Sequence, residues 1–318
     1  MLDAVSAALT DYYRGPEGDR QRLFDERMVG APVFDEADRF GQAVAAHYGL
    51  DALPEQLPAD FRPRALVVLP AHRDPLQAMA VDQLGWVTPI EASLAAARPM
   101  RPVRNLSIWP GATQLTEAEV ECVQRVGDAI GWAVKVVEGP LNEEAFKGFY
   151  EDPLPDVLWV IGHGEQSPYR LDETGIVMEG DVLLPISRLA DMTVPGGDRR
   201  LLILNICSSG ATQNRGGIAH VGVGHYLTSP RQAVVAHLWP IDYYAALAFG
   251  CALSIALSKY SLPDAFGQAI GLMRDRDQLL AALDVLEGNL QASDRLSAER
   301  IGAHLANLLN WGCPVLLT

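Results

Sequence analysis

The segments Val157–Gly164 (VLWVIGHG) and Leu201–Gly210 (LLILNICSSG) decide the fold that the sequence predicts. Each opens with a continuous run of apolar residues and then changes to glycine and small polar residues. Runs that do not alternate polar with apolar residues are typical of strands buried on both faces, as in a parallel sheet covered by helices. The two segments therefore predict two parallel strands, followed directly by turns that contain His163 and Cys207.

Five further apolar runs predict additional strands. They are Ala65–Leu69, Leu106–Trp109, Val134–Val137, Ala233–Leu238 and Val315–Leu317. Between the two deciding segments, Gly175–Met178 and Val182–Pro185 flank Glu179–Asp181, which predicts a small antiparallel hairpin.

Helical patterns separate these strands. Thr116 followed by Glu119 matches a capping box, and an apolar stripe at helical spacing follows it. Further helices are predicted over Gly217–Leu227, Tyr244–Leu257 and Asp264–Leu286. Alternating strand and helix signals predict an α/β fold, a three-layer α/β/α sandwich with a mainly parallel central sheet and the small antiparallel hairpin.

The first 60 residues predict a helical N-terminal extension. Met1–Tyr13 and Asp35–His47 carry apolar residues at helical spacing, and the proline-containing stretch Leu53–Pro63 marks a boundary. We therefore expect two parts, residues 1–60 and 61–318.

The composition argues against several classes of partner. The chain has 318 residues, of which 49% are apolar and 20% charged, so a sizeable core is expected. Its 25 Lys and Arg against 40 Asp and Glu give a net charge of -15. Because such a field repels phosphate, we expect neither nucleic acid nor an anionic membrane as a partner.

The cysteines and histidines bear on compartment and cofactors. The four cysteines are Cys122, Cys207, Cys251 and Cys313, without the CxxC spacing of redox or zinc sites, which fits a reducing compartment. With no visible targeting peptide and no apolar stretch long enough to span a bilayer, we expect a cytoplasmic protein. His220 and His225 are not at helical metal-site spacing, so neither a metal nor a cofactor is expected.

His163 and Cys207 are the candidate catalytic residues. In a parallel sheet, ligands bind beyond the carboxyl ends of the strands, so both side chains would lie at one edge. A thiolate and an imidazole there form a nucleophile and an acid–base group. The N–H groups of Gly164 and Cys207 would form an oxyanion hole. Taken alone, a cysteine at a strand end is more often a packed core residue.

Four ordered motifs resemble the CHAT family, bacterial relatives of caspases and separase. They are Val160–Gly164, Leu202–Gly210, Val234–Asp242 with its Leu-Trp-Pro-Ile-Asp ending, and Trp311–Leu316. The resemblance covers roughly residues 62–318 and implies a caspase-like peptidase domain. Residues 1–60 lie outside the motifs that carry this resemblance.

The resemblance implies cleavage of peptide bonds in proteins by a Cys207–His163 dyad, without a metal. It places Trp239, Asp242 and Ser208 near the substrate. Asp242 would favour a basic residue before the scissile bond, although Tyr243 stands where the family often has a second acid. The alternative for Asp242 is a helix cap, and both interpretations stay open.

Three functions remain for comparison. The first is an endopeptidase in a regulated bacterial stress or defence pathway, acting on protein or peptide substrates with a regulatory protein partner. The second is a caspase-fold interaction module without catalysis, and the third is a thiol amidase that acts on small molecules. The extension over residues 1–60 would dock a partner or cover the cleft, and the loop Ser208–Gly217 with Arg215 would be cut if the enzyme cleaves itself.

Overall fold

The structure is a computed structural model. It describes residues 39, 41–50, 52–56, 65–68, 76–84, 88–91, 100, 102–167, 170–215, 218–286 and 290–317. The helix expected over Met1–Tyr13 lies outside this set. The helix expected over Asp35–His47 is described only at residues 39 and 41–47, which are helical, and α4 (Leu53–Gln56) follows.

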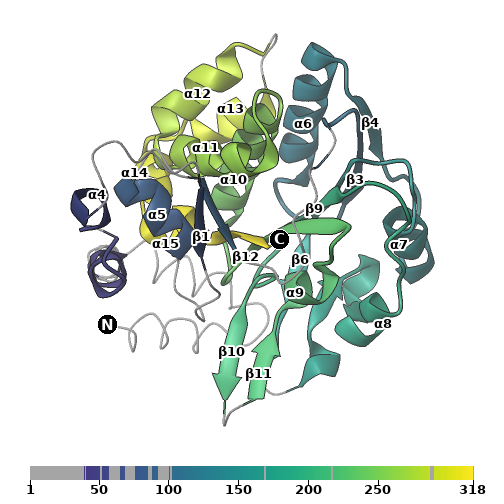
Figure 1. The fold of residues 1–318 in the computed structure, drawn as a ribbon. Coiled ribbons are helices and arrows are strands. Elements are labelled where there is room, and N and C mark those ends of the chain that lie inside the picture. The colour runs from purple at the N-terminus through teal and green to yellow at the C-terminus, as the bar shows by residue number, and fades with distance from the viewer. Residues whose placement is uncertain are drawn as a thin grey trace.

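A six-stranded sheet forms the centre of the molecule (Figure 1). Its spatial order is β13-β12-β9-β5-β3-β4, and only β13 is antiparallel to its neighbour. Every residue of β5, β9 and β12 is buried, which explains why these runs do not alternate. The expected mainly parallel sheet is confirmed. Its strands are β3 (Asn105–Pro110), β4 (Ala133–Val136), β5 (Val157–Ile161), β9 (Arg200–Asn205), β12 (Gln232–His237) and β13 (Pro314–Leu317).

Helices cover both faces of this sheet. Trp109 of β3 packs against Phe146 of α7 (Glu143–Tyr150) on one face. Trp159, the register partner of the adjacent Ile108, bonds to Glu119 of α6 (Thr116–Ile130) on the other face. Successive side chains of a strand point to opposite faces of the sheet, so neighbouring positions contact different helical layers.

Helix α10 (Tyr243–Leu257) packs against α6 and α11 (Leu262–Arg274), and α12 (Arg276–Asp284), α13 (Gln291–Leu296), α14 (Glu299–Leu305) and α15 (Leu308–Trp311) complete that side. On the α7 side lie α8 (Ile186–Ala190) and α9 (Val223–Leu227), which contact each other. None of the described helices is long and apolar enough to cross a membrane.

Three smaller sheets flank the central one. The predicted hairpin is confirmed as β7 (Gly175–Val177) and β8 (Leu183–Pro185), and β6 (His163–Glu165) adds a third strand. Short 3-10 turns, η2 (Leu171–Glu173) and η3 (Glu179–Asp181), lie beside these strands. One of the other two sheets pairs β1 (Ala65–Val68) with β2 (Thr88–Glu91), and α5 (Leu76–Leu84) lies between these strands in the chain. The other pairs β10 (Thr212–Arg215) with β11 (Ile218–Val221).

Two sequence predictions about helices were wrong in part. The helix expected over Gly217–Leu227 is a strand, β11, followed by the short α9, because residues 218–221 pair with β10 instead of with their own chain neighbours. The helix expected over Asp264–Leu286 is divided at Asp275, whose carboxylate accepts from the N–H of Gln278 and starts α12.

The capping box predicted at Thr116 and Glu119 was also wrong, although α6 begins there. The Thr116 hydroxyl donates to the Gly111 carbonyl (2.6 Å), and the N-cap of α6 has no side-chain hydrogen bond. Glu119 is only 3% exposed and points into the core. Its carboxyl is used by Trp159 and Asn205 instead of by the N-terminus of α6.

Candidate functional site

The pairing of β5 with β9 sets the positions of His163 and Cys207. These parallel strands are neighbours, and their last paired residues are Ile161 and Asn205. Two residues further along each chain lie His163 and Cys207. Because adjacent strands are about 4.8 Å apart, both residues leave the same edge of the sheet one strand spacing from each other.

Gly164 brings the two segments into close backbone contact. A Cβ atom at Gly164 would overlap the carbonyl oxygen of Cys207, which is backbone and cannot turn aside. Only glycine fits this approach without a shift of the chain. The structure thus brings together the two residues whose N–H groups were expected to form the oxyanion hole.

The loop between β12 and α10 contacts Cys207, and the first residue of α10 contacts His163. The Cys207 thiol is half-buried, and its Sγ lies 3.7 Å from the Ile241 carbonyl, to which it donates. The His163 side chain is exposed, and its ring meets the Tyr243 ring edge-on at 6.4 Å between centroids. Neither Ile241 nor Tyr243 was singled out as a contact of these groups from the sequence, although the motif Val234–Asp242 pointed to this loop.

The turn after Cys207 has an unusual backbone. Ser208 has φ 55, in the left-handed region that side chains other than glycine seldom adopt. Its N–H donates to the Trp239 carbonyl (3.2 Å), and the N–H of Gly210 donates to the His237 carbonyl (2.8 Å). The turn that carries the thiol is therefore fixed to the end of β12.

The other predicted substrate residues lie close by but are buried. Ser208 and Trp239 are each 3% exposed, and the Trp239 indole donates to the Leu309 carbonyl (2.7 Å). Asp242 is 4% exposed and caps α10, with Oδ1 accepting from the N–H of Tyr244 (2.8 Å). The helix-cap interpretation of Asp242 matches these contacts, and its role toward substrate stays a prediction.

Asp242 Oδ1 also lies 2.8 Å from Nε2 of the buried His304 of α14. Burial opposes ionisation of this carboxyl, but the hydrogen bond and charge of His304 and the N–H groups of α10 hold its pKa below the usual value. The α14 helix thus anchors the loop that contacts the candidate dyad.

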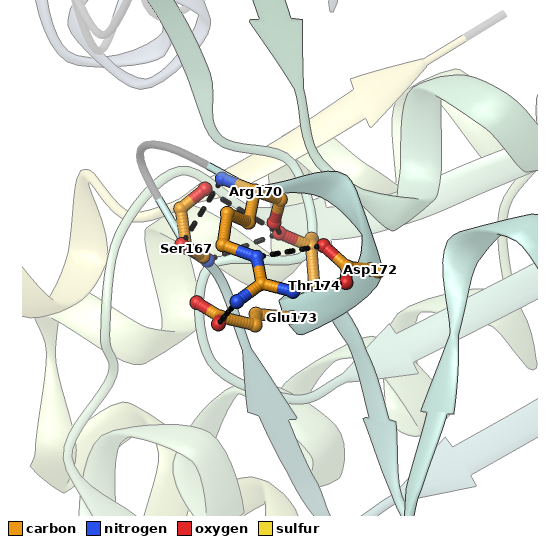
Figure 2. Close-up of polar contacts among 5 residues, drawn as sticks. All are labelled: Ser167, Arg170, Asp172, Glu173 and Thr174. Atoms are coloured by element: carbon orange, nitrogen blue, oxygen red, sulfur yellow. Dashed lines mark hydrogen bonds and ion pairs between the residues drawn. The ribbon is translucent and has the colours of Figure 1, made fainter.

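The loop that joins β6 to β7 contains exposed charged residues. Figure 2 shows Arg170 bonded to Asp172 (2.6 Å) and paired with Glu173 (2.9 Å), while Ser167 and Thr174 bond across the base of the turn. The charge of Arg170 is therefore met inside its own loop.

The remaining cysteines differ sharply from Cys207. Cys122, Cys251 and Cys313 are all 0% exposed. The pKa of Cys251 is raised by its bond to Cys122 and by burial, and burial raises the pKa of Cys313. These sulfurs are core groups, as the sequence predicted.

The described residues include no group of three or more His, Cys, Asp or Glu able to hold a metal ion. Of the two histidines considered earlier, His220 lies in β11 and His225 in α9, where its ring meets the Gly210 carbonyl at 3.2 Å and burial lowers its pKa.

Comparisons with known proteins bear on the family. The family model of the CHAT domain matches residues 20–281. A solved structure described as "Structure of Protease" matches at 12% identity with a TM-score of 0.38, over 73% of this chain and 54% of that chain. The match thus spans about half of that protease, and no curated protein matches this chain. Because the family model matches well over half of its length, the chain belongs to the CHAT domain family.

Proposed function

We propose that this chain is a cysteine endopeptidase that hydrolyses peptide bonds in protein substrates with Cys207 as nucleophile and His163 as acid and base. The observation that carries the proposal is the parallel pairing of β5 with β9, whose register brings both residues to one edge. Membership of a peptidase-related family adds to it. The His163 imidazole is exposed and the Cys207 thiol is half-buried, and an imidazole and a thiol are the two groups that acyl transfer of this kind needs.

The proposed reaction assigns each proton transfer and each change of bond to a named group. The Cys207 thiolate attacks the scissile carbonyl carbon, and the N–H groups of Gly164 and Cys207 stabilise the oxyanion. His163, as imidazolium, donates its proton to the departing amine when the C–N bond breaks. A water molecule then gives a proton to neutral His163 and attacks the thioester, and the carboxylic acid leaves as the C–S bond breaks.

The test is hydrolysis of an unstructured protein and of a random peptide library by purified chain. Wild type should cleave both, whereas Cys207→Ala and His163→Ala should be inactive and should unfold at the wild-type temperature. Cys251→Ala is the matched control, because it removes a buried thiol from α10 and leaves both His163 and Cys207 in place.

Other outcomes identify the alternatives. If wild type cleaves no peptide in the library, the interaction-module function is favoured. If it hydrolyses only small amides, the chain is a thiol amidase. Turnover by Cys207→Ala equal to wild type would refute the nucleophile assignment.

A direct chemical measurement complements the kinetics. Iodoacetamide should label one cysteine of the native protein, Cys207, because the other three thiols are fully buried. Mass spectrometry of the digested protein identifies the labelled residue. Labelling of Cys122 or Cys313 at the same rate would contradict the expected difference in access.

The library also tests the specificity proposed for Asp242. A preference for Arg or Lys before the cut that is lost in Asp242→Asn would support a role toward substrate. If Asp242→Asn changes stability but not preference, its contribution is the cap of α10 and the pairing with His304.

A further inference from the structure

A buried polar cluster lies behind the proposed catalytic edge. The Glu119 carboxyl accepts from the Trp159 indole N–H (2.8 Å) and from the Asn205 amide (2.7 Å), both at Oε1. The same Asn205 amide donates to the Ala246 carbonyl (3.0 Å), and its oxygen lies 2.7 Å from His237 Nε2. All four polar side chains are at most 3% exposed.

The hydrogen-bond directions in this cluster follow from protonation. Burial lowers the pKa of His237 to about 3, so the ring is neutral near pH 7. Since Asn205 uses its amide N–H groups toward Glu119 and Ala246, its oxygen is the acceptor and His237 Nε2 is the donor. The order therefore runs from His237 through Asn205 to Glu119, with no donor facing a donor.

The cluster connects the three chain segments that build the proposed site. Trp159 lies in β5 four residues before His163, and Asn205 ends β9 two residues before Cys207. His237 ends β12, which leads into the loop that contacts the Cys207 thiol. One carboxyl thus holds the strand that carries the base to the strand that carries the nucleophile.

His237 of this cluster also helps to hold the turn that follows Cys207. The N–H of His237 donates to the Ser209 hydroxyl (3.0 Å), and that hydroxyl donates to the carbonyl of Ile206 or Leu204. Ser208 lies between Cys207 and Ser209 in the chain and has the left-handed backbone described above. A strained turn persists only where its surroundings fix it.

Stability alone does not account for polar groups at these positions. A buried carboxyl is costly to desolvate, and apolar residues of similar volume pack such a core at least as well. A buried hydrogen-bond network does favour one arrangement of the core over others, because each hydrogen bond forms only when donor and acceptor are correctly placed. A unique arrangement is needed where two reacting groups must meet one carbonyl.

We propose that Asn205 and Glu119 are positioning residues, which fix the strand ends that carry Cys207 and His163 at the spacing that catalysis requires. This inference rests on the proposed peptidase function. Neither residue touches substrate. Both act through the turn and strand that they hold.

The experiment compares Asn205→Leu with Gln232→Leu. Gln232 lies at the start of β12, is 0% exposed, and bonds to Arg200 at the start of β9. Both variants therefore remove a buried amide between the same two strands, at opposite ends. Peptide hydrolysis is measured well below each unfolding temperature, together with the rate of Cys207 alkylation.

Asn205→Leu should lower kcat about tenfold or more with little change in KM, and should change the alkylation rate, because the reacting groups are misplaced. Gln232→Leu should leave both rates at the wild-type value. Glu119→Gln keeps the accepting oxygen and should retain most of kcat, whereas Glu119→Leu should resemble Asn205→Leu.

Several outcomes would overturn the inference. Asn205→Leu with wild-type kcat and alkylation but a lower unfolding temperature has a structural role only. Equal losses of kcat in Asn205→Leu and Gln232→Leu would show that any loosening of the two strands suffices. If Asn205→Leu does not fold, Asn205→Ser, which is too short to reach Glu119, takes its place. Failure of the peptidase function is distinguishable, because wild type itself would then be inactive.

Discussion

The two ends of the β9–β12 strand pair each hold a buried polar cluster, but in different surroundings. At the amino end, Arg200 donates to Gln232 (2.6 Å), Gln232 donates to the Tyr150 hydroxyl (2.9 Å), and the guanidinium lies over the Tyr150 ring. At the carboxyl end, Asn205 and His237 bond to each other. The ends are about 17 Å apart, given the rise of a strand.

The comparison separates cross-linking from positioning. The amino-end cluster joins the two strands at the end that is far from the proposed site residues. The carboxyl-end cluster precedes a left-handed turn and the close approach of Gly164 to Cys207. We therefore expect changes at the amino end to alter stability alone, and changes at the carboxyl end to alter activity as well.

The largest effect is expected from Gly164→Ala. The new methyl group would overlap the Cys207 carbonyl and push the two strand ends apart, so kcat/KM should fall about a hundredfold or more. Peptide hydrolysis measures it. Gly196→Ala, before the amino end of β9, is the control, since its methyl group would meet nothing closer than 4.0 Å. Wild-type activity in Gly164→Ala would contradict the close approach.

The next effect is a pH dependence of stability from Glu119. Burial raises the pKa of this carboxyl from 4.5 to about 8, so between these values the folded protein holds a proton that the unfolded chain releases. Stability from this group is present below pH 4.5 and is lost as pH rises to 8, at up to about 1.4 kcal/mol per pH unit.

Urea unfolding of wild type and Glu119→Gln from pH 5 to 8 measures this loss. The variant should lack it, so the difference between the two proteins should grow with pH. Parallel curves would show that Glu119 keeps an ordinary pKa.

A smaller effect is expected from Gln232→Leu at the amino end. Arg200 would lose the acceptor of a buried charged hydrogen bond, which should lower the free energy of unfolding by about 2–3 kcal/mol. Urea unfolding gives the value, and kcat should not change. A fall in kcat would remove the distinction between the two ends.

The smallest effect is expected from Ser209→Ala at the carboxyl end. The buried N–H of His237 would lose its acceptor, at a cost of about 1–2 kcal/mol. Because the turn with Cys207 would loosen, kcat should also fall by a few-fold. The loss in the free energy of unfolding should be about half of that expected for Gln232→Leu. Loss of stability without any loss of kcat would place Ser209 with the structural residues.

Local patterns predicted much of the fold. Continuous apolar runs revealed the buried strands, and the hairpin over Gly175–Pro185 was recognisable from its flanks, because burial on both faces and turn chemistry are written in short segments. Long-range pairing was not accessible in the same way. Val157 of β5 pairs with Leu201 of β9, for example, and no residue near either one identifies that partner. Even the local pairing of residues 218–221 with β10, which comes just before them in the chain, overrode a helical pattern.

Glu119 shows the same limit within the site. From the sequence it matched a helix cap, because its spacing from Thr116 fits one. In the structure its oxygen meets Trp159 and Asn205, 40 and 86 residues away. No local pattern contains those partners.

The sequence by itself determined the family motifs, the buried strands and the two reactive side chains that follow them, because each depends on a few consecutive residues. Only the tertiary structure decided which strands are neighbours, how closely Gly164 approaches Cys207, and which buried groups hold the turn. The physical reason is that these contacts join segments far apart in the chain, so they depend on how the whole chain packs and not on the few residues next to each one in the sequence.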